Sequence, residues 1–176
     1  MPSSRRLITS TTLSSSAASV TFSSIPSGYK DLVLKVSIRN SGDNGNNSAA
    51  MSTTFNGDTA NNYSWTYVWA NISSPNSGQT GNYSNIQGYF ISNGSSSTAS
   101  TFANTEIYIP NYASSTAKPV SYFGSPETNS TTLWANSIGA ALWRGTSAIT
   151  TILLKPVYGT NFVSGSSFYL YGLLDS

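Results

Sequence analysis

Apolar and polar side chains alternate along several short stretches of this chain with a period of two residues. The clearest stretch runs from Lys30 to Arg39, where charged residues fall on one face and four apolar residues on the other: Leu32, Leu34, Val36 and Ile38. This alternation predicts β-strands with one buried face and one face in water. No window of 11 or more residues holds the 3.6-residue apolar stripe of an amphipathic helix. The chain is therefore predicted to be all-β.

Further short segments share this strand character and are separated by clusters of Gly, Asn, Ser and Pro. The predicted strands are Val20–Phe22, Met51–Phe55, Tyr63–Trp69, Tyr83–Ile91, Thr101–Ile109, Val120–Phe123, Leu133–Trp143, Ala148–Leu154 and Ser167–Leu174. The predicted loops include Ser41–Ala50, Ser73–Gly81 and Ser92–Ser100. About ten short strands at this spacing predict a two-sheet antiparallel sandwich with a jelly-roll-like topology. We expect residues 17–176 to form one domain and residues 1–16 a flexible N-terminal arm.

The segment around Ile149 to Leu154 departs from simple alternation because apolar residues fall on both of its faces. Two structures explain this pattern. The segment is either a central strand covered on both faces within the monomer or a strand that contacts a neighbouring subunit of a symmetric homo-oligomer.

The composition is poor in charge and rich in aromatic residues. Only 8% of the 176 residues are charged, whereas Phe, Trp and Tyr make up 12%, so the chain is expected to fold with a surface of hydroxyl and amide groups. The formal net charge of +2 comes from scattered basic residues and predicts no nucleic-acid partner. No apolar run approaches the roughly 18 residues of a membrane span, and we expect no membrane contact.

The chemistry available to a catalytic site is narrow, because the chain has no histidine and no cysteine. A glycosidase would need two carboxylates in one cleft, and Glu106 and Glu127 are the candidate members of such a pair. The only acids are Asp31, Asp43, Asp58, Glu106, Glu127 and Asp175, none of them in a catalytic motif. Asp43 and Asp58 are predicted to stabilise turns, and the loop after Asp43 lacks the closing Glu of a calcium loop. We predict no enzyme activity, no metal and no cofactor.

The most distinctive cluster of aromatic residues is the run from Tyr63 to Trp69. Period two places Tyr63, Trp65, Tyr67 and Trp69 on one face of a single strand. These rings could form an exposed platform for sugar rings or a protein partner. The interpretation we favour is burial in a sandwich core or a subunit interface, because an uncovered patch of this size would promote aggregation.

Several stretches together, in this order, resemble a known group of proteins. They are Phe22–Leu32, Phe55-Asn56-Gly57-Asp58 followed by Asn62-Tyr63-Ser64-Trp65, Ile107–Tyr112, Trp143 followed by Ser147-Ala148-Ile149-Thr150, and Phe162 followed by Ser167–Leu173. This order, which spans most of residues 20 to 174, resembles a family of phage virion β-sandwich proteins that includes capsid decoration or cement proteins and tail or fibre modules. The resemblance implies a jelly-roll-like sandwich, often trimeric, on a particle surface, and it carries over no catalytic residue.

The resemblance leads to two functional expectations. The first is a capsid cement protein, trimeric as the resemblance implies, that binds the major capsid protein on the outer surface of a phage head. Arg5 and Arg6 of the arm either reach an acidic patch of the major capsid protein or belong to a solvated tail. The second is a tail or fibre module that binds host carbohydrate through exposed rings such as Trp65 and Trp69, or Trp134. We favour the first, because a chain of 176 residues leaves no room for a long shaft and because its aromatic rings are expected to be buried.

Overall fold

The computed structural model describes residues 5–44, 48–70, 74–126 and 136–174, and every regular element in these ranges is a β-strand. The large sheet contains, in spatial order, β1 (Arg5–Thr12), β12 (Ser167–Leu173), β3 (Asp31–Ile38), β8 (Ala103–Ile109), β9 (Lys118–Ser125), β10 (Asn136–Trp143), β5 (Tyr63–Ala70) and β6 (Pro75–Tyr83). The small sheet contains β2 (Val20–Phe22), β11 (Ile152–Pro156), β4 (Ser48–Phe55) and β7 (Ile86–Asn93). Within these ranges no helix is long and apolar enough to cross a membrane.

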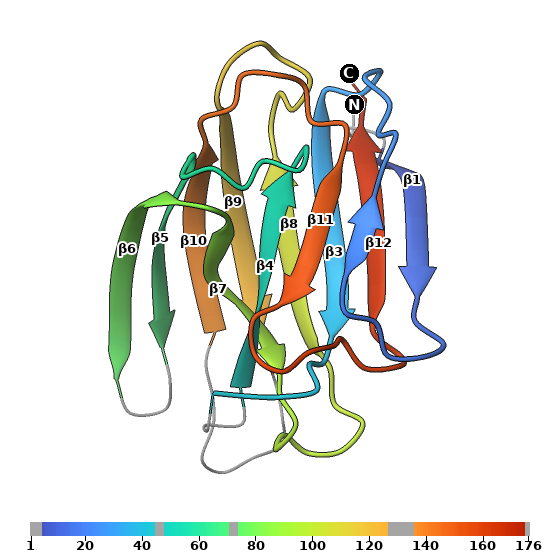
Figure 1. Cartoon of the computed structure of the whole chain (residues 1–176), viewed down its shortest axis with the longest axis vertical. Coiled ribbons are helices and arrows are strands. Elements are labelled where there is room, and N and C mark those ends of the chain that lie inside the picture. Colours follow the sequence, from blue (N-terminus) through green and yellow to red (C-terminus); the bar gives the residue numbers. More distant parts are fainter. Residues whose placement is uncertain (1–4, 45–47, 71–73, 127–135, 175–176) are drawn as a thin grey trace.

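The path of the chain between the two sheets is that of a jelly roll. The chain alternates between the sheets from β2 to β5, and it crosses again at β6–β7–β8 and at β10–β11–β12 (Figure 1). Every strand pair is antiparallel. A jelly roll has eight strands in two sheets of four. Here the three strands of the meander β8–β9–β10 take the place of one of those eight strands, and β12 and β1 extend the large sheet beyond β3. The predicted all-β, jelly-roll-like sandwich is confirmed.

The core lies between the inner faces of the two sheets. The apolar side chains predicted to share one face of β3 are all buried: Leu32, Leu34, Val36 and Ile38. Aromatic rings join the two layers, as where Phe90 of β7 meets Tyr122 of β9 edge to face, with the ring centroids 4.6 Å apart. The alternation of apolar and polar residues in β3 therefore correctly predicts which side chains face the core.

Two strands lie where the sequence predicts none, and both are edge strands. Two central strands have other bounds than predicted: β4 begins at Ser48, inside the predicted loop Ser41–Ala50, and β11 begins at Ile152 instead of Ala148. Residues 5–12, expected to belong to a flexible arm, form β1 and pair with β12. Residues 75–83, mostly inside a predicted loop, form β6 and pair with β5. An edge strand gains its main-chain hydrogen bonds from one neighbour, and the side chains of β6 are polar and largely exposed. Neither segment needs the apolar alternation by which buried strands are recognised.

The segment with apolar residues on both faces is a central strand of the small sheet. β11 lies between β2 and β4, with Ile152 and Leu154 buried in the core and Leu153 half-buried on the opposite face. The main-chain hydrogen bonds of β11 are thus satisfied inside the monomer. A subunit contact at its outer face remains a prediction.

Glycines on the inner face of the large sheet leave room for aromatic rings. Gly139 of β10 faces Tyr122 of β9, and a Cβ atom built on Gly139 would lie 2.1 Å from the Tyr122 hydroxyl oxygen and 2.6 Å from the Thr66 carbonyl oxygen. Gly78 of β6 faces the ring of Tyr67 in the same way, and Gly172 of β12 faces Tyr29. Each ring thus covers strand surface that has no side chain of its own.

We expect Gly139→Ala to lower the free energy of unfolding by about 2 kcal/mol, because the added methyl group meets a buried ring and a backbone oxygen that cannot both move aside. Urea denaturation followed by tryptophan fluorescence measures the change. The matched control is Gly81→Ala on β6, where nothing lies within 4 Å of the added atom and the change should stay within about 0.5 kcal/mol. Equal stability of the two variants would contradict this account of the packing.

Candidate binding surface

Two of the acids lie on the β3–β8 part of the large sheet, and they are too far apart to act as a catalytic pair. The carboxylate of Asp31 accepts hydrogen bonds from the Tyr108 hydroxyl at 2.8 Å and from the Asn111 amide at 2.9 Å. Glu106 points outward and pairs with Lys35 at 2.8 Å. Lys35 is opposite Glu106 and four residues from Asp31, which separates the acids by about 13 Å. A glycosidase pair needs about 5–10 Å.

The remaining described acids also serve internal contacts. Asp43 lies in the expected loop, and its carboxylate accepts hydrogen bonds from the Ser95 hydroxyl at 2.8 Å and the Ser96 amide at 2.9 Å. Glu127 and Asp175 lie outside the described residues. Within the described ranges, no three acidic side chains gather into a group that could hold a metal ion. The acids therefore hold loops and strands together.

Asp58 fixes the turn that follows β4. One carboxylate oxygen accepts the Ala60 amide at 2.9 Å, which is the predicted turn-stabilising contact. The other accepts the Trp143 indole N–H at 2.7 Å and the Asn62 side-chain amide at 3.0 Å. Burial alone would raise the pKa of Asp58, but these three hydrogen bonds outweigh it and lower the pKa. The carboxylate is therefore charged and acts as a structural acceptor.

The side chain beneath this turn is Tyr63. Its hydroxyl accepts the Phe55 amide at 3.0 Å and donates to the Asp58 carbonyl at 3.0 Å. Burial is the main cause that raises the pKa of Tyr63 to about 12, so the hydroxyl keeps its proton. Its ring stacks on that of Trp143, with the centroids 6.4 Å apart. The Phe55–Asp58 motif and Trp143 from the sequence analysis thus meet in one structural cluster.

Two cations are also held internally, by backbone oxygens. The Lys118 ammonium is buried and donates to the carbonyls of Ser114 at 2.9 Å, Thr116, and Thr146 at 3.4 Å. Burial lowers the pKa of Lys118. The Arg39 guanidinium donates in the same way to four carbonyls of the loop after β7, those of Ser95, Ser97, Thr98 and Thr101. These charges are used to hold loops, which removes them from the outer surface.

The four rings predicted to share one face of β5 differ in burial. Tyr63 and Trp65 are part of the core, as favoured from the sequence. Tyr67 and Trp69, toward the other end of the strand, are half-buried. Tyr63 and Trp65 are thus inaccessible to a partner, and the four rings do not form a continuous exposed platform.

The two arginines expected on the arm lie on β1 at the edge of the large sheet. Arg5 approaches Glu106 at 3.8 Å, and its guanidinium carbon lies 5.7 Å from the centroid of the Tyr171 ring. Arg6 is exposed. Because β1 is paired along its length, neither residue extends away from the domain on a free arm.

The outer face of the large sheet is divided by charge. The small sheet packs on the inner face, and strand register places outward residues of neighbouring strands side by side. Toward β1, the outer face carries Arg5, Lys35 and Glu106. Toward β6, none of the outward residues of the described strands β9, β10, β5 and β6 is charged, and we call this half the neutral face. The neutral face comprises Ser64, Thr66, Val68, Ala70, Ser77, Gln79, Pro119, Ser121, Phe123, Ser125, Asn136, Ile138, Ala140 and Leu142.

An apolar ridge crosses the neutral face. Phe123 of β9 is opposite Ile138 of β10, which is opposite Val68 of β5. All three side chains are exposed, by 52%, 60% and 50% respectively. Large apolar side chains exposed in adjacent strands form a contiguous patch, which is typical of an interaction surface.

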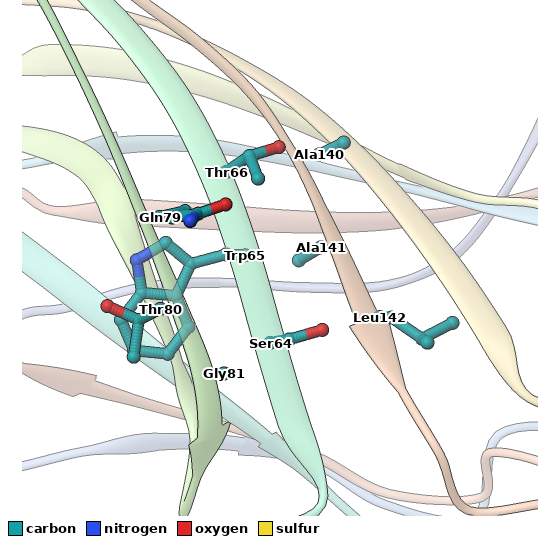
Figure 2. Close-up of a pocket in the computed structure, with 9 residues that line it drawn as sticks. All are labelled: Ser64, Trp65, Thr66, Gln79, Thr80, Gly81, Ala140, Ala141 and Leu142. Atoms are coloured by element: carbon teal, nitrogen blue, oxygen red, sulfur yellow. The ribbon is translucent and has the colours of Figure 1, made fainter.

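A shallow groove lies beside the ridge along β5. It has a volume of about 590 Å³ and is lined by short side chains such as Ser64, Thr66 and Ala140, with Gln79 and Leu142 at its sides. Figure 2 shows Thr66 next to Gln79 and Ala140 on the neighbouring strands. An adjoining depression of about 570 Å³ shares Thr66 and Gln79 with this groove, and Val68 and Ile138 of the ridge form part of its lining. The neutral face therefore carries both an exposed apolar ridge and a shallow groove.

Phe123, Ile138 and Val68 are not among the binding residues predicted from the sequence. The signal was present in β10, where apolar or small residues occupy both phases of the alternation from Ile138 to Trp143. Ala141 and Trp143 face the core, and Ile138 and Leu142 face outward. Assigning the second phase to the surface requires knowing that the other sheet covers only one face of β10.

Comparison with known proteins gives distant structural likenesses. No protein-family model and no curated protein matches the chain. An exo-inulinase from Aspergillus awamori aligns with 97% of this chain at 11% identity and a TM-score of 0.41, and this chain spans 30% of its length. Scytalido-glutamic peptidase aligns with 92% at 10% identity and a TM-score of 0.31, with 66% of its own chain covered. These values carry no argument about function.

We expect Asp58→Ala to lower the free energy of unfolding by about 2 kcal/mol, because it leaves the Trp143 indole N–H without its charged acceptor. Thermal denaturation followed by circular dichroism measures the loss. Glu106→Gln is the matched control, since it removes only an exposed ion pair and should cost less than about 1 kcal/mol.

The same contact predicts a dependence on acid. The folded-state pKa of Asp58 lies below its unfolded value of 3.8, so its contribution to stability is present above that pH and is lost as the pH falls through the folded-state pKa. As the pH falls below 3.8, Asp58→Ala should therefore lose less stability than the unmodified protein does. Parallel losses in the two proteins would contradict the assignment of Asp58.

Proposed function

We propose that this protein is a non-catalytic structural component of a phage virion, a decoration or cement protein on the outer surface of the head. The observation that carries the structural role is the use of the charged groups: the described acids, Lys118 and Arg39 all take part in contacts within the domain. The broad outer face of the large sheet is left for binding. We expect such a domain to bind its partner through shape complementarity and the surface area buried in the contact.

The assignment to a phage head is supported by the ordered sequence motifs. The motif Phe55-Asn56-Gly57-Asp58 closes the turn after β4, and Asn56 reaches across it to Ala148 and Thr150 of the later motif, with its side-chain amide 2.7 Å from the Ala148 carbonyl. The proposal is thus that these motifs preserve a sandwich suited to repeated attachment to the major capsid protein as a homo-oligomer.

The alternative is a carbohydrate-binding module of a tail or fibre. It would use exposed rings, and Tyr83 at 40% exposure packs against the edge of Trp65 near the groove. The burial of Tyr63 and Trp65 favours the shell role. Trp134, the third tryptophan considered from the sequence, lies outside the described residues.

Electron cryomicroscopy of the virions tests the proposal. We expect density for the 18.6 kDa chain at repeated symmetric sites over the shell, and heads that lack the protein should release DNA at a lower temperature than complete heads. The purified protein should bind such depleted heads and restore their stability. Density confined to the tail tip, together with binding on a glycan array, would overturn the shell role in favour of the alternative.

A further inference from the structure

We propose that the neutral face is the surface through which copies of this chain contact one another. The proposal rests on the structural role proposed above and names the partner of one particular surface. Three observations support a second copy as the occupant: the described outward residues of these four strands carry no charge, a ridge and a groove lie on one face, and the area is sufficient.

The first observation is charge. In a symmetric contact between identical faces, a charged side chain near the axis meets its own counterpart, and like charges repel. The outer face toward β1 carries Arg5, Lys35 and Glu106, whereas none of the outward residues on β9, β10, β5 and β6 is charged. A partner recognised through charge would find no group to pair with here. An identical neutral face meets no electrostatic penalty.

The second observation is shape. The ridge of Phe123, Ile138 and Val68 lies one outward position, about 7 Å, from the row of Thr66 and Ala140 that forms the floor of the groove. One face thus carries both a protruding apolar row and a depression lined by short side chains. The ridge of one copy can enter the groove of another, which makes the surface complementary to itself.

The third observation is area. Four strands at about 4.8 Å spacing and eight residues at about 3.4 Å rise give a surface of about 500 Å² per copy, and about 1,000 Å² for two copies. This value reaches the lower limit for a specific protein interface. Sheet faces pack at about 10 Å separation, a distance that side chains the size of Phe123 and Ile138 can fill.

Sedimentation equilibrium of the purified full chain tests the proposal. At about 100 µM the unmodified protein should sediment as a dimer, with twice the 18.6 kDa mass of one chain, because a contact between two identical faces pairs two copies. Ile138→Lys places a charge in the middle of the contact and should weaken association at least about thirtyfold, giving monomers. Circular dichroism shows whether the variant is folded, and Val68→Lys, one strand away, is the second variant.

The matched control is Leu7→Lys. Leu7 is 53% exposed on the outer face of β1, five strands from Ile138 and about 24 Å away. This variant should remain oligomeric. An unmodified protein that is monomeric, an oligomer unaffected by folded Ile138→Lys or Val68→Lys, or equal dissociation of Leu7→Lys would each overturn the proposal.

Attachment to shells is measured separately, on virions. A monomeric protein that still decorates shells would overturn self-association alone. An oligomer that dissociates as expected but is absent from the shell would overturn the proposed function alone.

Discussion

The dominant constraint on this fold is that an eight-stranded sheet is covered by a sheet of four strands. The small sheet covers the middle of the large one, and toward the edges aromatic rings lie over glycines, as Tyr67 does over Gly78 and Tyr29 over Gly172. A ring next to a glycine buries a large apolar area without a second layer of backbone. This arrangement explains how a chain with few charges and many aromatic residues can close a core of unequal layers.

The same constraint separates what the sequence predicts from what it does not. Strands beneath or within the small sheet, such as β3, are buried on one face and show a clear alternation. The edge strands β1 and β6 lack that signal, because a single neighbour supplies their hydrogen bonds and few of their side chains are buried. The rings of Tyr63 to Trp69 share a face, as their spacing predicts, but the drop in burial along β5 depends on where the small sheet ends.

The candidate surface was harder to predict than the core. Alternation in β10 shows that Ile138 and Trp143 lie on opposite faces, but which face is covered depends on pairing between residues far apart in the chain. The charged residues behave similarly. Asp58 was correctly predicted to stabilise a turn from its Gly and Asn neighbours, whereas its bond to Trp143 joins segments 85 positions apart. Contacts within a turn can thus be predicted from neighbouring residues, whereas hydrogen bonds between distant segments cannot.

The edges and the outer face of the large sheet differ in a way that bears on association. Open sheet edges invite unwanted pairing, and proteins limit this with charge, Pro or short irregular strands. Here β1 begins with two arginines, and β6 begins with Pro75 and contains two glycines. The outward residues of the neutral face carry no charge, and Phe123, Ile138 and Val68 are exposed there in one row. The chain therefore disfavours contact through its edges and leaves a side-chain surface, with its own ridge and groove, as the place where specific contact is favourable.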